Sequence, residues 1–485
     1  MMKLKTLTRW MLNAGVLMTL TACASGIPLL KANKAQPVAD KVAVELPADA
    51  RGVTVNEFQD ERWWTLLGDP GLNETVETAL SNNTDVRLAN ERLNEAGAVL
   101  GIAKSARWPA IFGQLTESRG RTTQAGNSPF FNPNVNESTR LGLGATWELD
   151  LWGKIAAQTD AARASLMAQS YNLRGVRLSV AATAASLYTQ VRVLGLQLNV
   201  LEQTLTSREQ AYALAKKRFE VGLINELQLR QTEAEYQTVK AQLPDTREQL
   251  SKVNNALSVL LAGKSSRIDA LSADNLKLTR VFILPADTPS ELLLRRPDLA
   301  AAEQQLAASE ANLEVARKAF FPSIGLSAFG GRESAALDRL FTGPAKVWNF
   351  QAQLTQPIFQ AGRLFDERDA AVARRNQAVL QYEASVRTAF QEVYDAIVAQ
   401  REARERLTAR EQQVQALAEV VRLAQLRVDN GVANQLELLD AQRNLLQAQL
   451  SWAGAWQAQQ GATLLMIRAL GGGFKADSTV ALNAQ

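Results

Sequence analysis

The side chains that most often carry enzyme chemistry are scarce in this chain of 485 residues. It contains no histidine, and Cys23 is its one cysteine. Histidine and cysteine metal sites and Ser-His-Asp triads therefore cannot form within one chain. The run Gly471–Gly473 lacks the Lys-Ser/Thr of a phosphate-binding loop, so we expect it to end a helix. The residues predict neither catalysis nor a bound cofactor or metal.

Two pairs of carboxylates have a regular spacing. Glu437 and Asp440 lie three residues apart, which places them on one face of a helix. Acids with this spacing are most often simply solvated, so the spacing alone gives them no function. Glu148 and Asp150 alternate along a predicted strand, which favours a water-filled lumen over acid-base catalysis. Their meaning depends on the elements that position them.

The single cysteine follows a segment with the form of a secretory signal. Residues 1–22 have a basic start, a short apolar run and then small residues. The segment ends Leu20-Thr21-Ala22-Cys23, which resembles a bacterial lipobox. We therefore expect Cys23 to be the mature N-terminus and to carry covalent lipid. The alternative is an ordinary signal followed by a chance cysteine.

Net charge gives no indication of a nucleic-acid partner. Lys3, Lys5 and Arg9 lie in the expected signal, and their removal from 53 basic residues leaves 50 against 49 acidic residues. A neutral, solvated surface does not favour nucleic acid. No later stretch holds some twenty uninterrupted apolar residues, so the sequence predicts no helical membrane span.

The chain repeats itself. Residues 103–111 match residues 316–324 at an offset of 213, and from Gly153 against Gly362 onward the offset is 209. A constant offset over such a length indicates a duplication. The predicted segments are a signal peptide at 1–22, an N-terminal tether at 23–70, a first repeat at 71–263, a linker at 264–289, a second repeat at 290–474 and a polar tail at 475–485.

Each repeat contains a pair of segments with the period of a strand. Odd positions are apolar from Leu141 to Leu151, and even positions are small or polar. This alternation predicts a strand with one face in an apolar medium and the other in water. We expect strands at about 109–119, 139–151, 322–331 and 347–359. The edge of a soluble sandwich is the alternative, although ten-residue alternating segments with terminal aromatics suit an outer-membrane strand.

Long helices follow the strands in both repeats. Apolar residues recur every seven positions, which predicts supercoiling against neighbouring helices. The first series is Leu166, Leu173, Val180, Leu187, Leu194 and Leu201, and the second runs from Val372 to Val428 with a single break at Gln400. Each series ends at a glycine turn, and the 69 residues from Gly153 to Gly222 would span roughly 100 Å as one helix. A return helix follows each turn, and Pro244 should kink or break the first of them.

Four strands pose a problem that one chain cannot solve. They cannot close a barrel, and an open edge in lipid leaves backbone groups unpaired. The strands must then be shared between copies, with eight strands nearly filled by side chains and twelve leaving a lumen. The heptad stripes need partner helices as well, so the sequence predicts a homo-oligomeric tube.

Over nearly all of residues 20–474 the chain resembles the TolC-like outer-membrane factor family, in particular its lipoprotein branch. The segments that carry the resemblance are Leu20–Cys23, Trp147–Lys154, Leu293–Leu299, Ala319–Ser323 and Ala469–Phe474. The family implies a trimer in which twelve strands form an outer-membrane β-barrel continuous with a long α-helical barrel. It also implies docking to a periplasmic adaptor and an RND-type inner-membrane transporter. Ala24, after Cys23, implies sorting to the outer membrane of a Gram-negative bacterium.

The resemblance gives the two glycine turns and the nearby acids a role. The turns correspond to Val221-Gly222-Leu223 and Asn430-Gly431-Val432, which would form the adaptor-docking tip. In the second turn, Asn430 stands in place of the valine of the family's usual Val-Gly pair. Glu437 and Asp440 match the acids that ring the periplasmic aperture, and three chains would place six carboxylates around one axis. Ala433 stands where the family often has a basic partner, so a latch would use other groups.

The resulting hypothesis is an α+β membrane protein that serves as a passive exit channel of a tripartite pump for drugs or other toxic small molecules. One alternative is a duct for type I protein secretion. Another is a structural envelope lipoprotein that conducts nothing.

Overall fold

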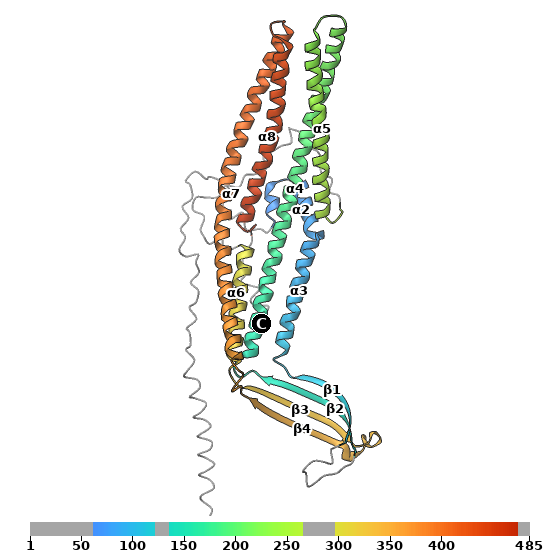
Figure 1. Ribbon diagram of the computed structural model, residues 1–485, viewed down its shortest axis with the longest axis vertical. Coiled ribbons are helices and arrows are strands. Elements are labelled where there is room, and N and C mark those ends of the chain that lie inside the picture. Colours follow the sequence, from blue (N-terminus) through green and yellow to red (C-terminus); the bar gives the residue numbers. More distant parts are fainter. Residues whose placement is uncertain (1–61, 122–134, 265–295, 474–485) are drawn as a thin grey trace, which may run out of the picture. The chain divides into compact units, whose positions relative to one another are not determined.

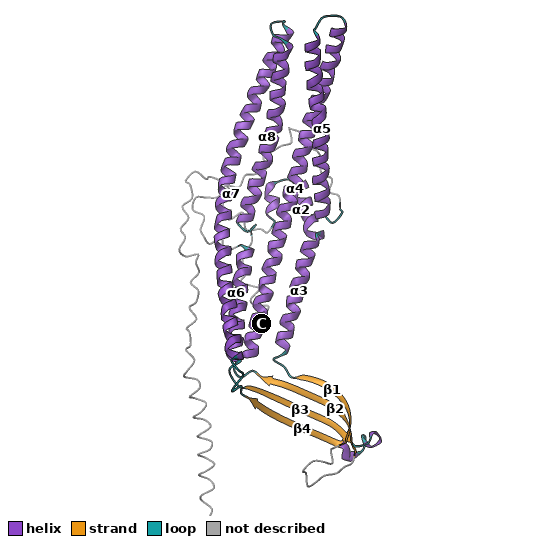
Figure 2. Cartoon of the chain, viewed as in Figure 1, coloured by secondary structure: helices purple, strands orange, loops and turns teal. Residues whose placement is uncertain are grey.

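The computed structural model describes residues 62–121, 135–264 and 296–473. The expected signal with Cys23, most of the linker at 264–289 and the tail at 475–485 lie outside these residues. Within them the two repeats have the same order of elements: helix, strand, strand, long helix, turn, helix (Figure 1). The long helices lie side by side, and the strands continue beyond one end of them (Figure 2). This confirms the predicted duplication of a strand pair and a helical hairpin.

The four strands form one antiparallel sheet in the order β1-β2-β3-β4. Their bounds are β1 Ala110–Arg121, β2 Val135–Leu149, β3 Ser323–Ser334 and β4 Lys346–Thr355. Two of the predicted bounds were wrong by four residues. Strand β2 begins earlier than expected because its polar residues 135–138 still pair with β1, and backbone pairing needs no apolar side chain. Strand β4 ends earlier because Pro357 has no N–H to donate to a neighbour.

The register gives the sheet two unlike faces. Residues directly opposite each other share a face. One face carries Trp147 opposite Leu326 and Ala328 opposite Phe350, whereas the other carries Thr146 opposite Ser327 and Gln351. The large apolar side chains of the first face are exposed to solvent, with Ile111, Leu115, Leu143, Trp348, Phe350 and Leu354 all more than 60% accessible. A single chain therefore leaves an apolar sheet face uncovered.

Two helical hairpins make up most of the rest of the protein. Helices α4 (Lys154–Glu220) and α5 (Glu226–Leu260) form the first, and α7 (Arg363–Asp429) and α8 (Gln435–Ala469) form the second. Helices α4 and α7 have 67 residues each, which corresponds to about 100 Å. Helices α3 (Thr84–Ser105) and α6 (Pro297–Lys318) pack beside their lower halves. The sheet and the hairpin turns thus lie at opposite ends of the same long helices (Figure 1).

The seven-residue series is the packed side of each long helix, as predicted. Every member of the first series is buried or half-buried, and so is every member of the second series, which recurs at seven-residue intervals from Val372 to Val428. Gln400, which breaks the second series, is itself buried. The heptad stripes therefore mark the side of each long helix that packs against its neighbours, as Leu201 does against α5 and α8 and Val386 against α6.

Two helix predictions need correction. Residues 72–107, rich in Ala, Leu, Glu and Arg, are predicted from composition to form one helix, but Asn83 ends α2 (Pro70–Asn82) and accepts hydrogen bonds from the N–H groups of Asp85 and Val86 to begin α3. Helix α5 is not broken at Pro244 and runs through it. Pro244 is exposed, so water can reach the Lys240 carbonyl that loses its usual donor.

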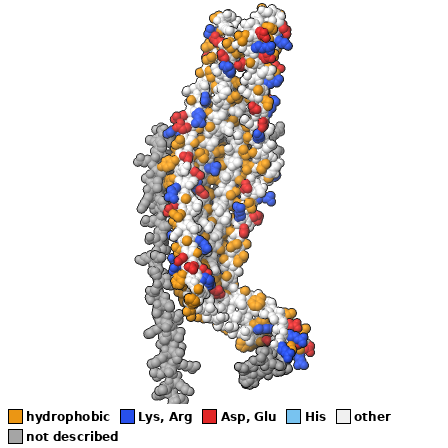
Figure 3. All heavy atoms as spheres, in the orientation of Figure 1, with side chains coloured by type: hydrophobic (Ala, Val, Ile, Leu, Met, Phe, Trp, Pro, Cys, Tyr) orange, Lys and Arg blue, Asp and Glu red, His pale blue; other side chains and the backbone are white. Residues whose placement is uncertain are grey.

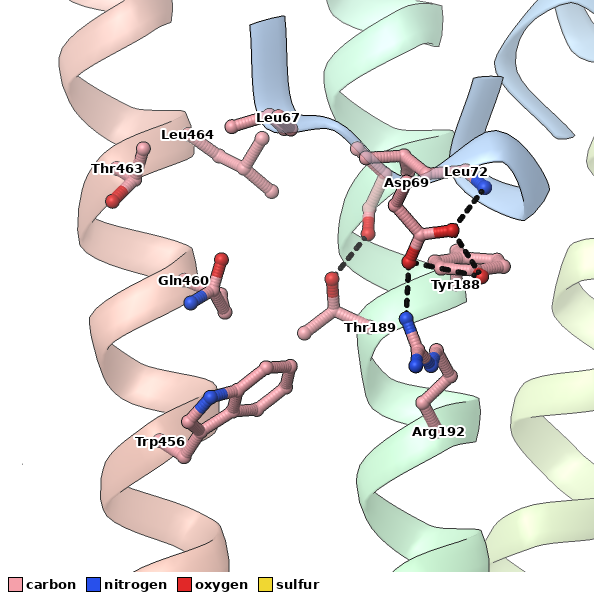
Figure 4. Close-up of a pocket in the computed structure, with 11 residues that line it drawn as sticks. Leu67, Asp69, Leu72, Tyr188, Thr189, Arg192, Trp456, Gln460, Thr463 and Leu464 are labelled. Carbon is pink, nitrogen blue, oxygen red and sulfur yellow. Dashed lines mark hydrogen bonds and ion pairs between the residues drawn. The ribbon is translucent and has the colours of Figure 1, made fainter. Parts of the chain in front are cut away.

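A clamp of three polar side chains joins the N-terminal segment to α4 (Figure 4). Asp69 caps α2 and accepts hydrogen bonds from the Tyr188 hydroxyl, at 3.0 Å, and from the Arg192 guanidinium. Burial, and to a smaller degree the neighbouring Asp69 carboxylate, raise the pKa of Tyr188 to about 12. The adjoining cavity, bordered by Trp456 of α8, is about 20 Å³, which accommodates a water but no substrate.

Candidate functional site

The first hairpin turn follows directly from its glycine. Helix α4 ends at Glu220, and Gly222 has a φ of 76°, the left-handed conformation that glycine adopts without steric cost. The Leu223 N–H then donates to the Arg218 carbonyl at 2.8 Å, which satisfies one of the last free carbonyls of the helix. Asn225 and Gln228 form a capping box that begins α5. Open space surrounds Gly222, so its conformation alone requires glycine.

The second turn repeats this geometry. Gly431 has a φ of 72°, and the Val432 N–H donates to the Arg427 carbonyl at 2.8 Å. The side chain of Asn430, the departure from the usual pattern, donates to the Leu426 carbonyl at 2.7 Å. Asn430 therefore serves as an additional cap for the end of α7, and the two turns have the same backbone path.

Apolar side chains project into solvent at both turns. Val221, Leu223 and Val432 are 69%, 73% and 70% accessible, far more than such residues would be in a closed core. The predicted tip residues of the two turns therefore form two exposed apolar points at the ends of the hairpins (Figure 3). Such points suit contact with another protein.

Each predicted gate carboxylate has an arginine beside it. The Glu437 carboxylate accepts a hydrogen bond from Arg427 of α7 at 2.9 Å, and Asp440 forms an ion pair with Arg443 at 2.9 Å. All four side chains are substantially exposed. Within one chain the two acids share a helix face but are electrostatically balanced, so they form no isolated negative patch.

Arg443 connects these acids to a buried cation between the two hairpins. Arg443 lies 3.7 Å from Glu235 of α5, and Glu235 lies 3.9 Å from Arg208 of α4. Arg208 also donates a hydrogen bond to Gln442 of α8 at 2.7 Å, and its side chain is only 3% accessible. Burial lowers the pKa of Arg208, which reflects the cost of holding a cation there. This group, named here the inter-hairpin network, ties α4 and α5 to α8 near the tips.

Sequence reasoning missed Arg208, Glu235 and Gln442, although one signal was present. The first heptad series continues from Leu201 to position 208, so Arg208 occupies a position that should be apolar. A charged residue at such a position marks a buried polar contact. No comparable signal identifies Glu235, which depends on how the two hairpins pack.

Neither a cluster of metal ligands nor a membrane-spanning helix is found in the part of the chain that the structure describes. Among the described residues no group of three or more potential metal ligands lies together. In residues 62–121, 135–264 and 296–473, no helix is both long and apolar enough to cross a membrane.

A sheet with one uncovered apolar face, set at the end of two 67-residue helices whose far ends carry exposed apolar turns, is the arrangement expected of an envelope protein that serves as a conduit. Comparison with known sequences agrees. The family described as "Outer membrane efflux protein" matches residues 75–263 and 288–472, which correspond to the two repeats.

Relatives and solved structures extend over most of the chain. The "Cation efflux system protein CusC" of Escherichia coli O6:H1 is 30% identical over 422 residues, 87% of this chain and 90% of that protein. The "Antibiotic efflux pump outer membrane protein ArpC" of Pseudomonas putida is 32% identical over 419 residues, 86% of each. The crystal structure of the Campylobacter jejuni CmeC outer membrane channel has a TM-score of 0.81 at 27% identity, covering 91% of this chain and 93% of that one.

The chain therefore belongs to the outer membrane efflux protein family. It is an efflux channel protein of the Gram-negative outer membrane that extends into the periplasm, and it is a transporter without enzymatic activity. The predicted class, localisation and absence of catalysis are confirmed.

Proposed function

We propose that three copies of this chain form the exit channel of a tripartite efflux pump. The observation that carries the proposal is the open sheet, whose edge strands β1 and β4 have no further partner strand among the described residues. Pairing β4 of one copy with β1 of the next satisfies both edges. Three copies give twelve strands, which enclose a lumen that eight strands would fill.

The two sheet faces support this arrangement. The face with Leu143, Trp348 and Phe350 is exposed and apolar, and would lie against lipid. The opposite face carries Asn349, Gln351 and Thr146, which suit a water-filled interior. Lipid on Cys23 would add a second attachment to the same membrane, because one acyl group alone binds weakly and reversibly.

The hairpin tips are the proposed docking points for a periplasmic adaptor, which would connect the channel to an RND-type inner-membrane transporter. The support is the exposure of Val221, Leu223 and Val432 on turns that backbone hydrogen bonds close. Neither Gly222 nor Gly431 has another atom near its missing side chain, so a partner can approach the backbone closely.

The proposed gate combines Glu437 and Asp440 with the inter-hairpin network. Opening an aperture at the tips requires one hairpin to move relative to the other, and the contacts of Arg208 with Gln442 and of Glu235 with Arg443 cross between the hairpins. These contacts can serve as the latch that Ala433 cannot provide. Within each copy, Arg427 and Arg443 neutralise Glu437 and Asp440. The six carboxylates of a trimer would therefore favour cations strongly only after contacts with a neighbouring copy break these ion pairs.

The proposed cargo is small toxic compounds, which a separate pump selects. The support is the small size of two cavities, about 20 Å³ beside Asp69 and about 80 Å³ beside Trp63 and Gly472, since sites for drug-sized compounds are several times larger. The names of the relatives mention cations for CusC and antibiotics for ArpC. A duct that makes no specific contacts is compatible with such different substrates.

Planar-bilayer recording of the purified protein tests the channel. We expect discrete conductance steps that grow more frequent when Glu437→Gln and Asp440→Asn are combined with loss of the Arg208 contact. A protein that inserts as trimers but conducts in none of these forms would refute the channel and favour a structural lipoprotein.

A further inference from the structure

The connection between β3 and β4 lies at the end of the sheet that points away from the helices (Figure 1). It contains two short helical turns, Leu337–Arg339 and Gly343–Ala345. Leu340 and Ala345 are buried and anchor the connection against the sheet. Leu337 and Phe341 are 66% and 69% accessible, so two large apolar side chains project from an ordered segment.

Two cations stand directly opposite each other beside this segment. Arg332 of β3 pairs in register with Lys346 of β4. Both lie on the apolar face of the sheet, because Lys346 is two residues from Trp348 and Arg332 is opposite Leu141. Like charges placed opposite each other on a sheet are destabilising unless a counter-charge lies between them.

No acid of the described chain supplies that counter-charge. Arg332 donates to the carbonyls of Leu340 and Thr342 and lies over the Phe341 ring, and neither Arg332 nor Lys346 has an ion pair with another described residue. Arg339 adds a third exposed cation in the connection. Asp338 is the one acid between positions 334 and 346.

Two other cations at this end of the sheet are paired with acids. Arg119 forms an ion pair with Glu137 at 2.7 Å on the apolar face, and Arg140 lies 3.9 Å from Glu333 on the polar face. Lys and Arg side chains gather visibly at this end of the sheet (Figure 3). On the apolar face this leaves Arg332, Lys346 and Arg121 of β1 as cations without an ion pair among the described residues, against the one such acid, Glu117, and Arg339 adds a cation in the connection.

The height of this patch fits the surface of a membrane. Leu354 and Lys346 are eight residues apart on β4, about 26 Å along the strand, or roughly 20 Å across a membrane for a strand tilted by about 40°. The apolar band of such proteins is roughly 25 Å tall. The cations thus lie at the outer boundary of the band, where lipid headgroups begin.

We propose that Arg332, Arg339 and Lys346 bind the phosphate groups of a phosphorylated glycolipid in the outer leaflet, with Leu337 and Phe341 against its acyl chains. This inference rests on the proposed insertion of the sheet in the outer membrane. Guanidinium and ammonium groups both bind phosphate oxygens through charge-assisted hydrogen bonds. Three cations at the same end of the sheet suit a headgroup with two phosphates better than a phospholipid with one, and the bound anion would relieve the repulsion between Arg332 and Lys346.

The test begins with the full-length protein purified from the outer membrane fraction as an oligomer and stripped of lipid. Native mass spectrometry then follows its titration with bisphosphorylated lipid A, with the phosphate-free form of the same glycolipid and with phosphatidylethanolamine. The test variant is Arg332→Gln/Lys346→Gln. The control is Arg247→Gln/Lys252→Gln on α5, which removes the same charge from paired cations far from the sheet.

We expect bisphosphorylated lipid A to bind at least about tenfold more tightly than the other two lipids, and the test variant, but not the control, to lose that preference. Arg339→Gln alone, which lies outside the strands, should weaken binding severalfold even if the double variant folds poorly. Equal binding of the phosphate-free lipid, or unchanged binding by both test variants, would overturn the inference. A protein recovered outside the outer membrane would instead overturn the proposed location of the sheet, and this is established before any lipid is added.

Discussion

Replacement of Arg208 by leucine should loosen the contact between the two hairpins without unfolding either one. Leucine restores the apolar series at this heptad position and removes a buried charge, and Glu235 keeps Arg443 as its ion-pair partner at 3.7 Å, so no carboxylate is left unpaired. The variant loses the 2.7 Å hydrogen bond to Gln442, which connects α4 to α8. The melting temperature should therefore stay nearly constant, whereas the contact between Arg208 and Gln442 near the tips is lost.

The magnitude follows from the type of bond that is lost. A hydrogen bond to a charged group contributes about 1.5–3 kcal/mol. If three copies open together, the three lost bonds amount to about 4.5–9 kcal/mol, and each ~1.4 kcal/mol changes the ratio of open to closed channels by a factor of ten. The open fraction should rise by several orders of magnitude, up to saturation.

Single-channel recording measures this open fraction directly, and sensitivity of cells to a large antibiotic that intact outer membranes exclude provides a second measure. Arg247→Leu is the matched control, because Arg247 forms an equally short bond with Glu202 but within the first hairpin. If Arg208→Leu inserts as trimers and its open probability equals that of Arg247→Leu, the inter-hairpin network is not a latch.

Three further predictions concern separate parts of the chain. Gly222→Pro, which cannot adopt the positive φ at this turn, should leave trimers inserted but abolish efflux, and unchanged drug resistance would count against docking at the tip. The raised pKa of Tyr188, about 12 in the folded protein against roughly 10 when unfolded, means that the folded chain keeps a proton that the unfolded chain loses. Stability should then fall by up to about 1.4 kcal/mol per unit as pH rises from 10 to 12, and a Tyr188→Phe variant with the same slope in chemical denaturation would contradict this. Cys23→Ala should remove the mass of the lipid and move the protein out of the lipid-anchored fraction, whereas a mass difference equal to the side-chain substitution alone would favour the ordinary signal.

The sequence predicted the architecture well because periodic patterns determine it. The period-two stretch at Leu141–Leu151 and the seven-residue series through Leu201 each constrain many residues at once, and a duplication supplies each pattern twice. Single positions were harder to predict. Asn83 divides a helix by capping the next one, and Pro244 is tolerated because it faces solvent, and neither outcome can be read from periodicity.

The candidate site was predicted only in its local parts. The turns at Gly222 and Gly431 follow from the chain itself, because few residues but glycine tolerate such a φ. The partners of Glu437 and Arg208 depend on packing between helices that lie far apart in sequence. Arg427 is ten residues from Glu437, and Gln442 is 234 residues from Arg208. The sequence shows that Ala433 stands at the position of the usual basic residue. It does not show which groups form the latch contacts in its place.

The position of the N-terminal clamp determines how much slack a lipid anchor would have. Trp63 packs in the same cluster as Ala181, which is 27 residues, or about 40 Å, along α4 from Lys154 beside the sheet. The 40 residues between Cys23 and Trp63 could extend to at most about 140 Å. The maximum length of this segment is thus more than three times the distance of about 40 Å between Ala181 and the sheet end of α4. A lipid at Cys23 would retain the protein at the membrane without exerting tension on it, and the angle of the helices to the membrane would be set by the sheet alone.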